Sequence, residues 1–137
     1  SNHLCFAWGE RLFSGDHVMG WSTTVVIPPD GHMGAYMASL ARLQQRSETL
    51  YHPAHGEPVE EPQRLLRGLL THRLQRERQL LRLLEQAPGT LSEVTARAYP
   101  GLDQRLVRAA EATALAHLIT LSERGEVACV EERWTLS

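Results

Sequence analysis

A long stretch of helical spacing in the middle of the chain constrains the fold most. Pro62 suits the first turn of a helix, and Gln63–Gln86 predicts one continuous helix that ends at Pro88-Gly89. At about 100° per residue, leucines gather on one side of this helix and arginines on the other. These are Leu65, Leu69, Leu80 and Leu83 against Arg64, Arg67, Arg78 and Arg82. The pattern predicts an amphipathic helix that packs against other parts of the chain.

Two further helices and a hairpin are predicted after it. Thr90 or Ser92 can cap a helix through Ala98, and Asp103 can cap a longer one that ends near Gly125. Two apolar runs then form a candidate hairpin, Val127–Val130 and Trp134–Leu136. Three helices followed by a two-stranded hairpin is the order of a winged helix. We therefore predict a mostly helical, winged-helix-like domain over residues 63–137.

Residues 1–62 alternate between strand-like and helical patterns, so the fold class of the whole chain is predicted to be α+β. The expected elements are a hairpin of Leu4–Trp8 with Arg11–Phe13, a strand at Thr23–Ile27, a helix at Met33–Arg46 and a short strand at Thr49–Tyr51. The first strand-like run begins without a turn or a cap before it. A strand placed there needs a neighbour, so we expect it to belong to a longer chain.

Composition excludes some classes of function. The formal net charge is −2 and every basic residue is arginine, so no overall field attracts nucleic acid or anionic membranes. No apolar run approaches the roughly 20 residues of a membrane span. Cys5 and Cys129 are far apart and form no C-x-x-C pair, which is typical of reduced thiols in a cytoplasmic protein. The arginine bias also suggests a GC-rich bacterial genome.

Two side chains are candidate metal ligands. Asp16 ends a strand in Phe13-Ser14-Gly15-Asp16-His17, and His55 follows a strand in Tyr51-His52-Pro53-Ala54-His55-Gly56. A carboxylate can bridge two cations, and a neutral imidazole on a proline-stiffened loop is a good zinc ligand. Each residue alone is more often a turn residue or a surface histidine.

Together with their surroundings, these motifs resemble a known family. Phe13–Met19, Gly20–Val25, Pro28–Gly31 and Pro53–Gly56 are similar, in order and spacing, to the C-terminal segment of metallo-β-lactamase-fold hydrolases. The similarity is greatest to the β-lactamase-like protein 2 group, whose members also carry a C-terminal winged helix. The resemblance implies that residues 1–62 are the C-terminal part of an αββα metallo-β-lactamase sandwich.

The resemblance also implies a reaction and a ligand set. Asp16 would be the bridging carboxylate and His55 the last histidine ligand of a site for two Zn²⁺ ions. Such sites hydrolyse ester, thioester or phosphodiester bonds. The family's H-x-H-x-D-H motif and its T-P-G-H histidine do not occur in this sequence. We therefore expect the chain to be inactive alone and its partner to be the missing N-terminal half of the domain.

The long helix carries two further candidates, His72 and Arg76, on or beside its apolar side. One interpretation is a ladder of i,i+4 pairs such as Arg73 with Glu77. The other is that His72 and Arg76 face the active-site cleft and contact an anionic group of the substrate. The stretch from His72 to Gln79 also resembles a recurring pattern of the family, which favours the second interpretation.

The competing function is a binding module, in which the winged helix docks a protein, dimerises or binds nucleic acid. A surface that reads DNA is clearly basic. Here Arg105, Arg108 and Arg124 are offset by acidic residues of the same helix and of the hairpin, so nucleic acid is not the favoured partner. A second copy of the chain could instead cover the exposed edge of the first strand and form a homodimer.

Overall fold

A computed structural model describes residues 3–137, which form two compact units. Unit 1 comprises the residues up to Val25 and Ala35–His72, and unit 2 comprises Val26–Gly34 and Arg73–Ser137. The helix α2 (Pro62–Gln86) contributes to both units, so the sequence-based boundary at 62/63 stays a prediction. Within the described residues, no helix combines the length and the apolar character that a membrane span requires.

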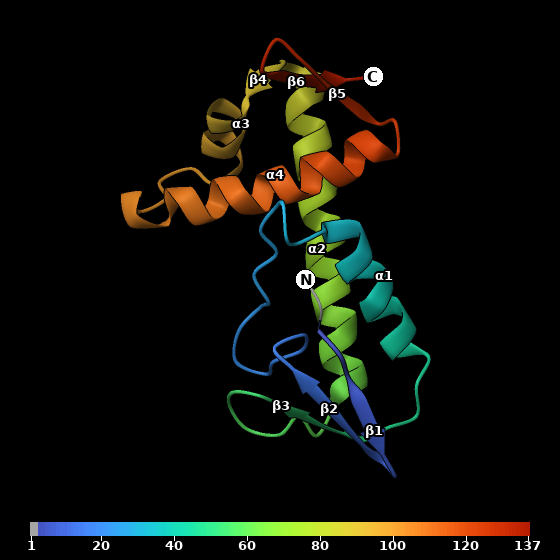
Figure 1. Ribbon diagram of the computed structural model, residues 1–137. Helices are drawn as coiled ribbons and strands as arrows, with labels where there is room; N and C mark the ends of the chain where they lie inside the picture. The colour runs from blue at the N-terminus through green and yellow to red at the C-terminus, as the bar shows by residue number, and fades with distance from the viewer. Residues whose placement is uncertain (1–2) are drawn as a thin grey trace. The chain divides into compact units, whose positions relative to one another are not determined.

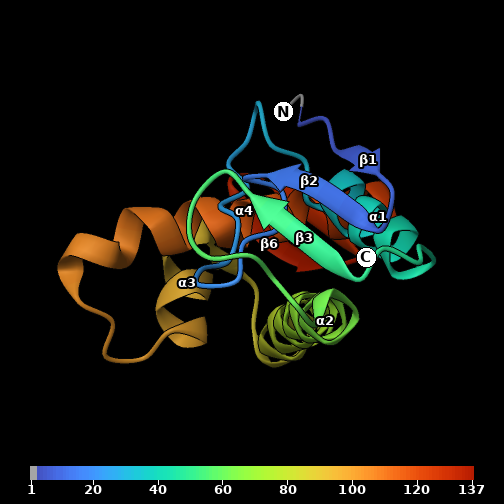
Figure 2. The ribbon, with the colours of Figure 1, turned by 90° about the horizontal axis from the view of Figure 1, so that it is seen from below.

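Unit 1 contains a three-stranded sheet in the order β1-β2-β3 (Figures 1 and 2). β1 (Phe6–Trp8) and β2 (Arg11–Gly15) form an antiparallel hairpin, as the sequence predicts. β3 (Leu50–Pro53) pairs parallel to β2, and α1 (Met33–Gln44) lies between these two strands in the sequence. The pairing register between β2 and β3 shifts between Phe13 and Gly15, as it does at a β-bulge.

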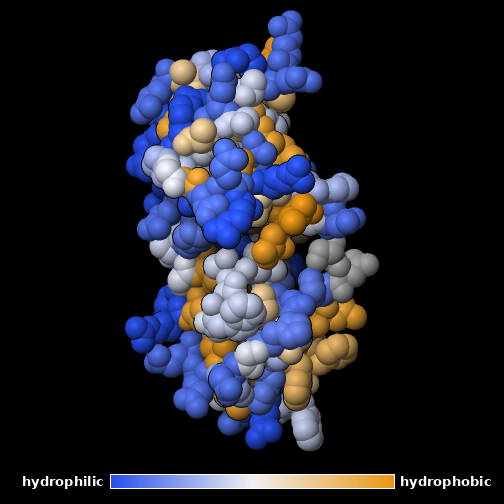
Figure 3. Space-filling view, turned by 90° about the vertical axis from the view of Figure 1, so that its left-hand side faces the viewer, coloured by the Kyte–Doolittle hydropathy of each residue, from blue (hydrophilic) through white to orange (hydrophobic). Residues whose placement is uncertain are grey.

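The two faces of this sheet differ in burial. Leu12 of β2 and its neighbour Tyr51 of β3 are fully buried and belong to the core, together with Leu40 of α1. On the opposite face, Phe6 and Trp8 remain 64% and 75% exposed. Hydrophobic side chains reach the molecular surface in several places (Figure 3), and in unit 1 this sheet face supplies some of the largest. One face of the sheet is thus covered and the other is not.

Unit 2 has the helices and the sheet of a winged helix. The residues 73–86 of α2 are followed by β4 (Gly89–Thr90), α3 (Leu91–Ala98), the 3₁₀ turn η1 (Gln104–Leu106), α4 (Val107–Glu123), β5 (Val127–Val130) and β6 (Arg133–Leu136). The strand order is β4-β6-β5. The core of the unit is formed by Leu80, Leu84, Val94, Ala98, Leu118, Leu121, Val127 and Trp134. The predicted α+β class and the winged-helix order are confirmed.

Local hydrogen bonds explain where these elements begin and end. Thr90 and Glu93 form a capping box at the start of α3, because each side chain accepts a hydrogen bond from the backbone N–H of the other residue. Arg97 donates hydrogen bonds to the carbonyl oxygens of Leu83 and Ala87 at the end of α2. These two carbonyls at the helix end are thus satisfied within the unit.

The prediction of a strand at Thr23–Ile27 is wrong. These residues have no regular secondary structure and pair with no strand, and Val25 and Ile27 are exposed. A β-branched run indicates only that a segment can pair, and among the described residues no strand lies beside this one. The two-residue strand β4 was not predicted, because a pattern of alternating polarity needs a longer run than Gly89-Thr90.

Candidate metal and substrate site

Asp16 lies in a tight loop at the end of β2. The amide of His17 donates to the carbonyl oxygen of Ser14 at 3.1 Å, and the Ser14 hydroxyl donates to the carbonyl oxygen of Val18 at 2.9 Å. The Thr24 hydroxyl lies 2.6 Å from the carbonyl oxygen of Asp16 and 3.0 Å from that of His17. These bonds fix the backbone on both sides of Asp16, so its carboxylate is held by a rigid loop.

His55 lies in a second closed loop, after β3. The amide of Ala54 donates to the carbonyl oxygen of Gly15 at 3.1 Å, which ties this loop to the end of β2. Tyr51 and Val59 exchange backbone hydrogen bonds of 3.0 and 2.8 Å, which close the loop at its base. The strand ends therefore bring Asp16 and His55 together, as two parallel strands do at one edge of a sheet.

The two predicted ligands face each other. Nε2 of His55 lies 3.7 Å from Oδ1 of Asp16, which is too long for a hydrogen bond. Oδ1 is shielded from solvent and has no hydrogen-bond partner among the described residues. An orphaned carboxylate oxygen opposite an imidazole nitrogen fits two ligands of one metal ion. Within residues 3–137, however, no group of three or more histidine, cysteine or acidic side chains could hold a metal.

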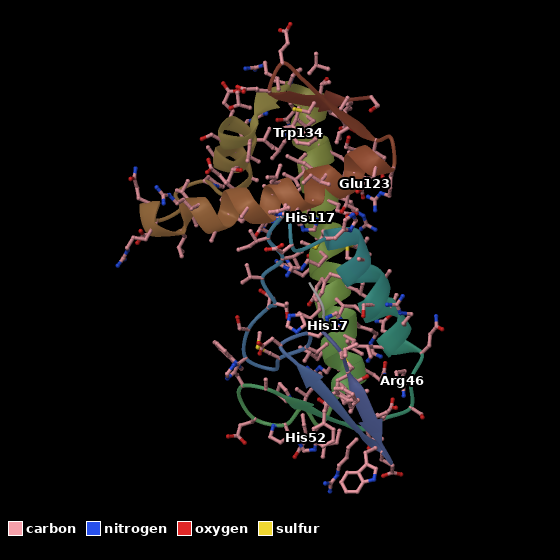
Figure 4. The ribbon with its side chains drawn as sticks, viewed as in Figure 1. His17, Arg46, His52, His117, Glu123 and Trp134 are labelled. Atoms are coloured by element: carbon pink, nitrogen blue, oxygen red, sulfur yellow. The ribbon has the colours of Figure 1, made fainter. Side chains whose placement is uncertain are left out.

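His17 follows Asp16 but points into unit 1. Its ring contacts Tyr36 edge-on, with the ring centroids 5.1 Å apart, and its Nε2 is buried. Burial, with smaller contributions from His3 and Arg42, lowers the pKa of His17. Figure 4 shows His17 and His52 on separate segments of the unit. His52 stacks on Phe13 at 5.2 Å, so its ring packs on a neighbouring strand.

The two residues predicted to contact substrate, His72 and Arg76, lie in different units. His72 is exposed and lines a cavity of unit 1. Arg76 belongs to unit 2, where its guanidinium stacks on Tyr99 at 4.1 Å and donates to Gln79 and to the carbonyl oxygen of Ala98. These contacts give Arg76 a structural role inside unit 2. A role of either residue toward substrate stays a prediction.

Trp21 contacts the loop of His55, which the sequence patterns did not predict. Its indole lies against Gly56, the residue after His55, so closely that a Cβ at Gly56 would come within 2.5 Å of the ring. Gly56 also has a φ of +87°, which disfavours other residues. The glycine in the Pro53–Gly56 motif therefore lets Trp21 pack beside the loop of His55.

The chain is similar to several known proteins. Residues 90–134 match the β-lactamase associated winged helix domain. The chain is 35% identical over 88 residues to an atrochrysone carboxyl ACP thioesterase of a Cryptosporiopsis strain, a match that covers 63% of this chain and 26% of that protein. It is 30% identical over 131 residues to the β-lactamase-like protein 2 homolog of Drosophila melanogaster, a match that covers 93% of this chain and 44% of that protein.

A solved structure has the same fold. A metallo-β-lactamase family protein of Thermus thermophilus superposes with a TM-score of 0.77 and 25% sequence identity, over 93% of this chain and 42% of that protein. The chain thus spans about a quarter of the length of the fungal relatives and less than half of the insect and bacterial proteins.

Proposed function

We propose that this chain, which is similar to the C-terminal region of metallo-β-lactamase-fold proteins with its winged helix, is part of a metal-dependent hydrolase of esters or thioesters. The observation that carries the proposal is the approach of His55 Nε2 to the orphaned Asp16 Oδ1. The thioesterase named among the relatives supports a thioester as the bond that is cleaved.

In this proposal Asp16 and His55 each supply one ligand to a metal site that the rest of the domain completes. Bound zinc would activate a water molecule and polarise the scissile carbonyl. The two loops at the ends of β2 and β3 hold the ligand atoms in place, since their backbones are fixed by hydrogen bonds to Ser14, Thr24 and Gly15. Two ligands do not hold an ion tightly, so the 137-residue chain alone is expected to retain substoichiometric zinc and to be inactive.

The substitution Asp16→Asn tests this assignment in a longer version of the protein that contains the whole domain. The amide keeps the shape of the side chain but removes the charge that a cation needs, so we expect zinc content to fall and thioester hydrolysis to drop about 100-fold or more. Zinc is measured by elemental analysis and hydrolysis with an acyl N-acetylcysteamine thioester.

Glu10→Gln is the matched control, because Glu10 is an exposed carboxylate of the same unit, in the β1–β2 turn. It should leave both zinc content and hydrolysis unchanged. Wild-type metal content in Asp16→Asn would refute the ligand role of Asp16. Zinc held stoichiometrically by the 137-residue chain would show that other residues of this chain complete the site.

The exposed face of the sheet in unit 1 is proposed to pack against the remainder of the metallo-β-lactamase domain. Phe6 pairs in register with Phe13, and Trp8 lies on the same face two residues further along β1. All three side chains are exposed, which is unusual for large hydrophobic residues that share one face of a sheet.

The double substitution Phe6→Ala/Trp8→Ala should therefore have different effects in two contexts. In the 137-residue chain it removes little buried area, so the urea midpoint of unit 1 should hardly change. In the longer protein it should lower the free energy of unfolding by about 3 kcal/mol or more, because two buried aromatic rings are lost. Equal small effects in both contexts would contradict the proposal, and a dimer of the shorter chain that dissociates on substitution would assign the face to a second copy.

A further inference from the structure

Unit 1 contains a cavity of about 760 Å³ beside the loop of His55. Its walls come from the loop after β2 (Gly20–Thr23), the segment after β3 (Glu57–Glu61) and the first turns of α2. The volume lies within the roughly 300–1,000 Å³ that small-molecule sites occupy. Trp21 lines the cavity and also packs on Gly56, so the cavity adjoins the residue next to the candidate ligand His55.

The chemistry of the walls favours an uncharged occupant. Trp21, Val59, Leu65 and Leu69 supply apolar surface. Among the described residues that line the cavity, Arg64 is the one arginine. Its guanidinium forms an ion pair with Glu61 at 3.1 Å, and both side chains are largely exposed. A second carboxylate, Glu57, adds negative charge. A site for a phosphate or a nucleic-acid backbone needs an excess of positive charge, which this lining lacks.

Gly68 leaves open space at the helix wall of the cavity. A Cβ added at Gly68 would meet no atom within 4 Å, so the helix surface is open toward the cavity at this position. Glycine costs helix stability relative to most other residues, by about 1 kcal/mol against alanine. A side chain here would both stabilise α2 and reduce the space of the cavity.

We propose that this cavity binds the apolar acyl chain of the substrate, next to the metal site that cleaves its ester or thioester bond. The inference rests on the proposed hydrolase function for the identity of the bond, but the binding of an apolar chain can be measured without any hydrolysis. The exposed indole of Trp21 and the leucines of α2 would contact the chain.

The test uses decanamide, a neutral acyl chain whose amide resists hydrolysis, and the 137-residue chain labelled for ¹H–¹⁵N spectroscopy. We expect saturable shifts at the amides that line the cavity, among them Gly20, Val59 and Leu69. The variant Gly68→Leu should weaken decanamide binding at least about tenfold, since its side chain occupies the space of the ligand. Thr71→Leu, an exposed position on the same helix, is the matched control and should bind like the wild type.

The inference is overturned if decanamide shifts no lining amide, or if Gly68→Leu binds it as well as Thr71→Leu does. A short single-stranded oligouridylate serves as the competing probe, and its binding to the cavity in place of decanamide would also overturn the inference. Decanamide binding with no hydrolysis by the longer protein would refute the proposed function alone. Hydrolysis by the longer protein with a chain-length preference unchanged by Gly68→Leu would refute the acyl site alone.

Discussion

Replacing Glu77 with alanine is expected to destabilise unit 2 by about 3 kcal/mol. Glu77 is buried, yet its Oε2 accepts a hydrogen bond from Arg124 at 2.8 Å and its Oε1 lies 3.7 Å from Nδ1 of His117. Burial alone would raise the pKa of Glu77, but His117 and Arg124 together outweigh it, so the pKa is lowered and the carboxylate stays ionised. Removal of Glu77 takes a charged hydrogen-bond acceptor from the half-exposed Arg124, leaves the buried His117 ring without its neighbour and opens a cavity at a buried position.

The measurement is hydrogen exchange of the amides in β5 and β6 under native conditions, because it reports the opening of unit 2 without depending on unit 1. Glu85→Ala is the control. Glu85 lies on the same helix but is exposed, so its loss should change the free energy of opening by no more than about 0.5 kcal/mol. A loss below about 1 kcal/mol for Glu77→Ala would mean that the contacts of this carboxylate contribute little to stability.

The contacts of Glu77 also show where sequence patterns stop being informative. The spacing of Arg73 and Glu77 predicts a pair along one helix, but it says nothing of Arg124, which lies 47 residues further along the chain. Only the packing of α4 on α2 brings these side chains together. Arg76 of α2 stacks on Tyr99, the residue that follows α3, and helical periodicity cannot distinguish this contact from a position facing a cleft.

Elements with strong local signals were predicted well. Pro62 and Pro88-Gly89 define the ends of α2 to within a few residues, and of the two expected caps of α3, Thr90 and Ser92, it is Thr90 that caps the helix. Thr23–Ile27 failed as a strand because pairing depends on a neighbour, not on the segment itself. The loops of Asp16 and His55 were predicted from motifs, whereas the contact of Trp21 with Gly56 could not be predicted, since it joins segments far apart in sequence.

Acidification from about pH 7 to about pH 5 is expected to destabilise unit 2 through His117. His117 of α4 is completely buried beside α2 (Figure 4). Burial lowers its pKa most strongly, Glu77 opposes this shift, and the charges of Arg73 and Arg76 add to it, so the net pKa is below the ordinary value of 6.5. Below pH 6.5 the unfolded chain therefore binds a proton that the folded chain does not, and the free energy of unfolding falls as the pH falls.

Glu77 adds a second loss at lower pH with the same sign. Its pKa is lowered in the folded state, so the stability it contributes is present above pH 4.5 and is lost as the pH falls through the lowered value. The two windows can be separated by substitution. His117→Leu removes the group that titrates near neutrality, so the stability of unit 2 should become nearly independent of pH between about 7 and 5, while the loss below about pH 4.5 remains.

The control for this experiment is the other histidine of unit 2 among the described residues. His32 is exposed, and its Nε2 lies 2.8 Å from a carboxylate oxygen of Glu123. His32→Gln should leave the decline between about pH 7 and pH 5 in place, as followed by hydrogen exchange of β5 and β6. A decline that persists in His117→Leu would show that the acid sensitivity does not come from the buried imidazole. If the decline in stability is lost in His117→Leu but not in His32→Gln, the acid sensitivity is assigned to the buried imidazole. That ring takes up a proton in the unfolded chain and is hindered from doing so in the folded one.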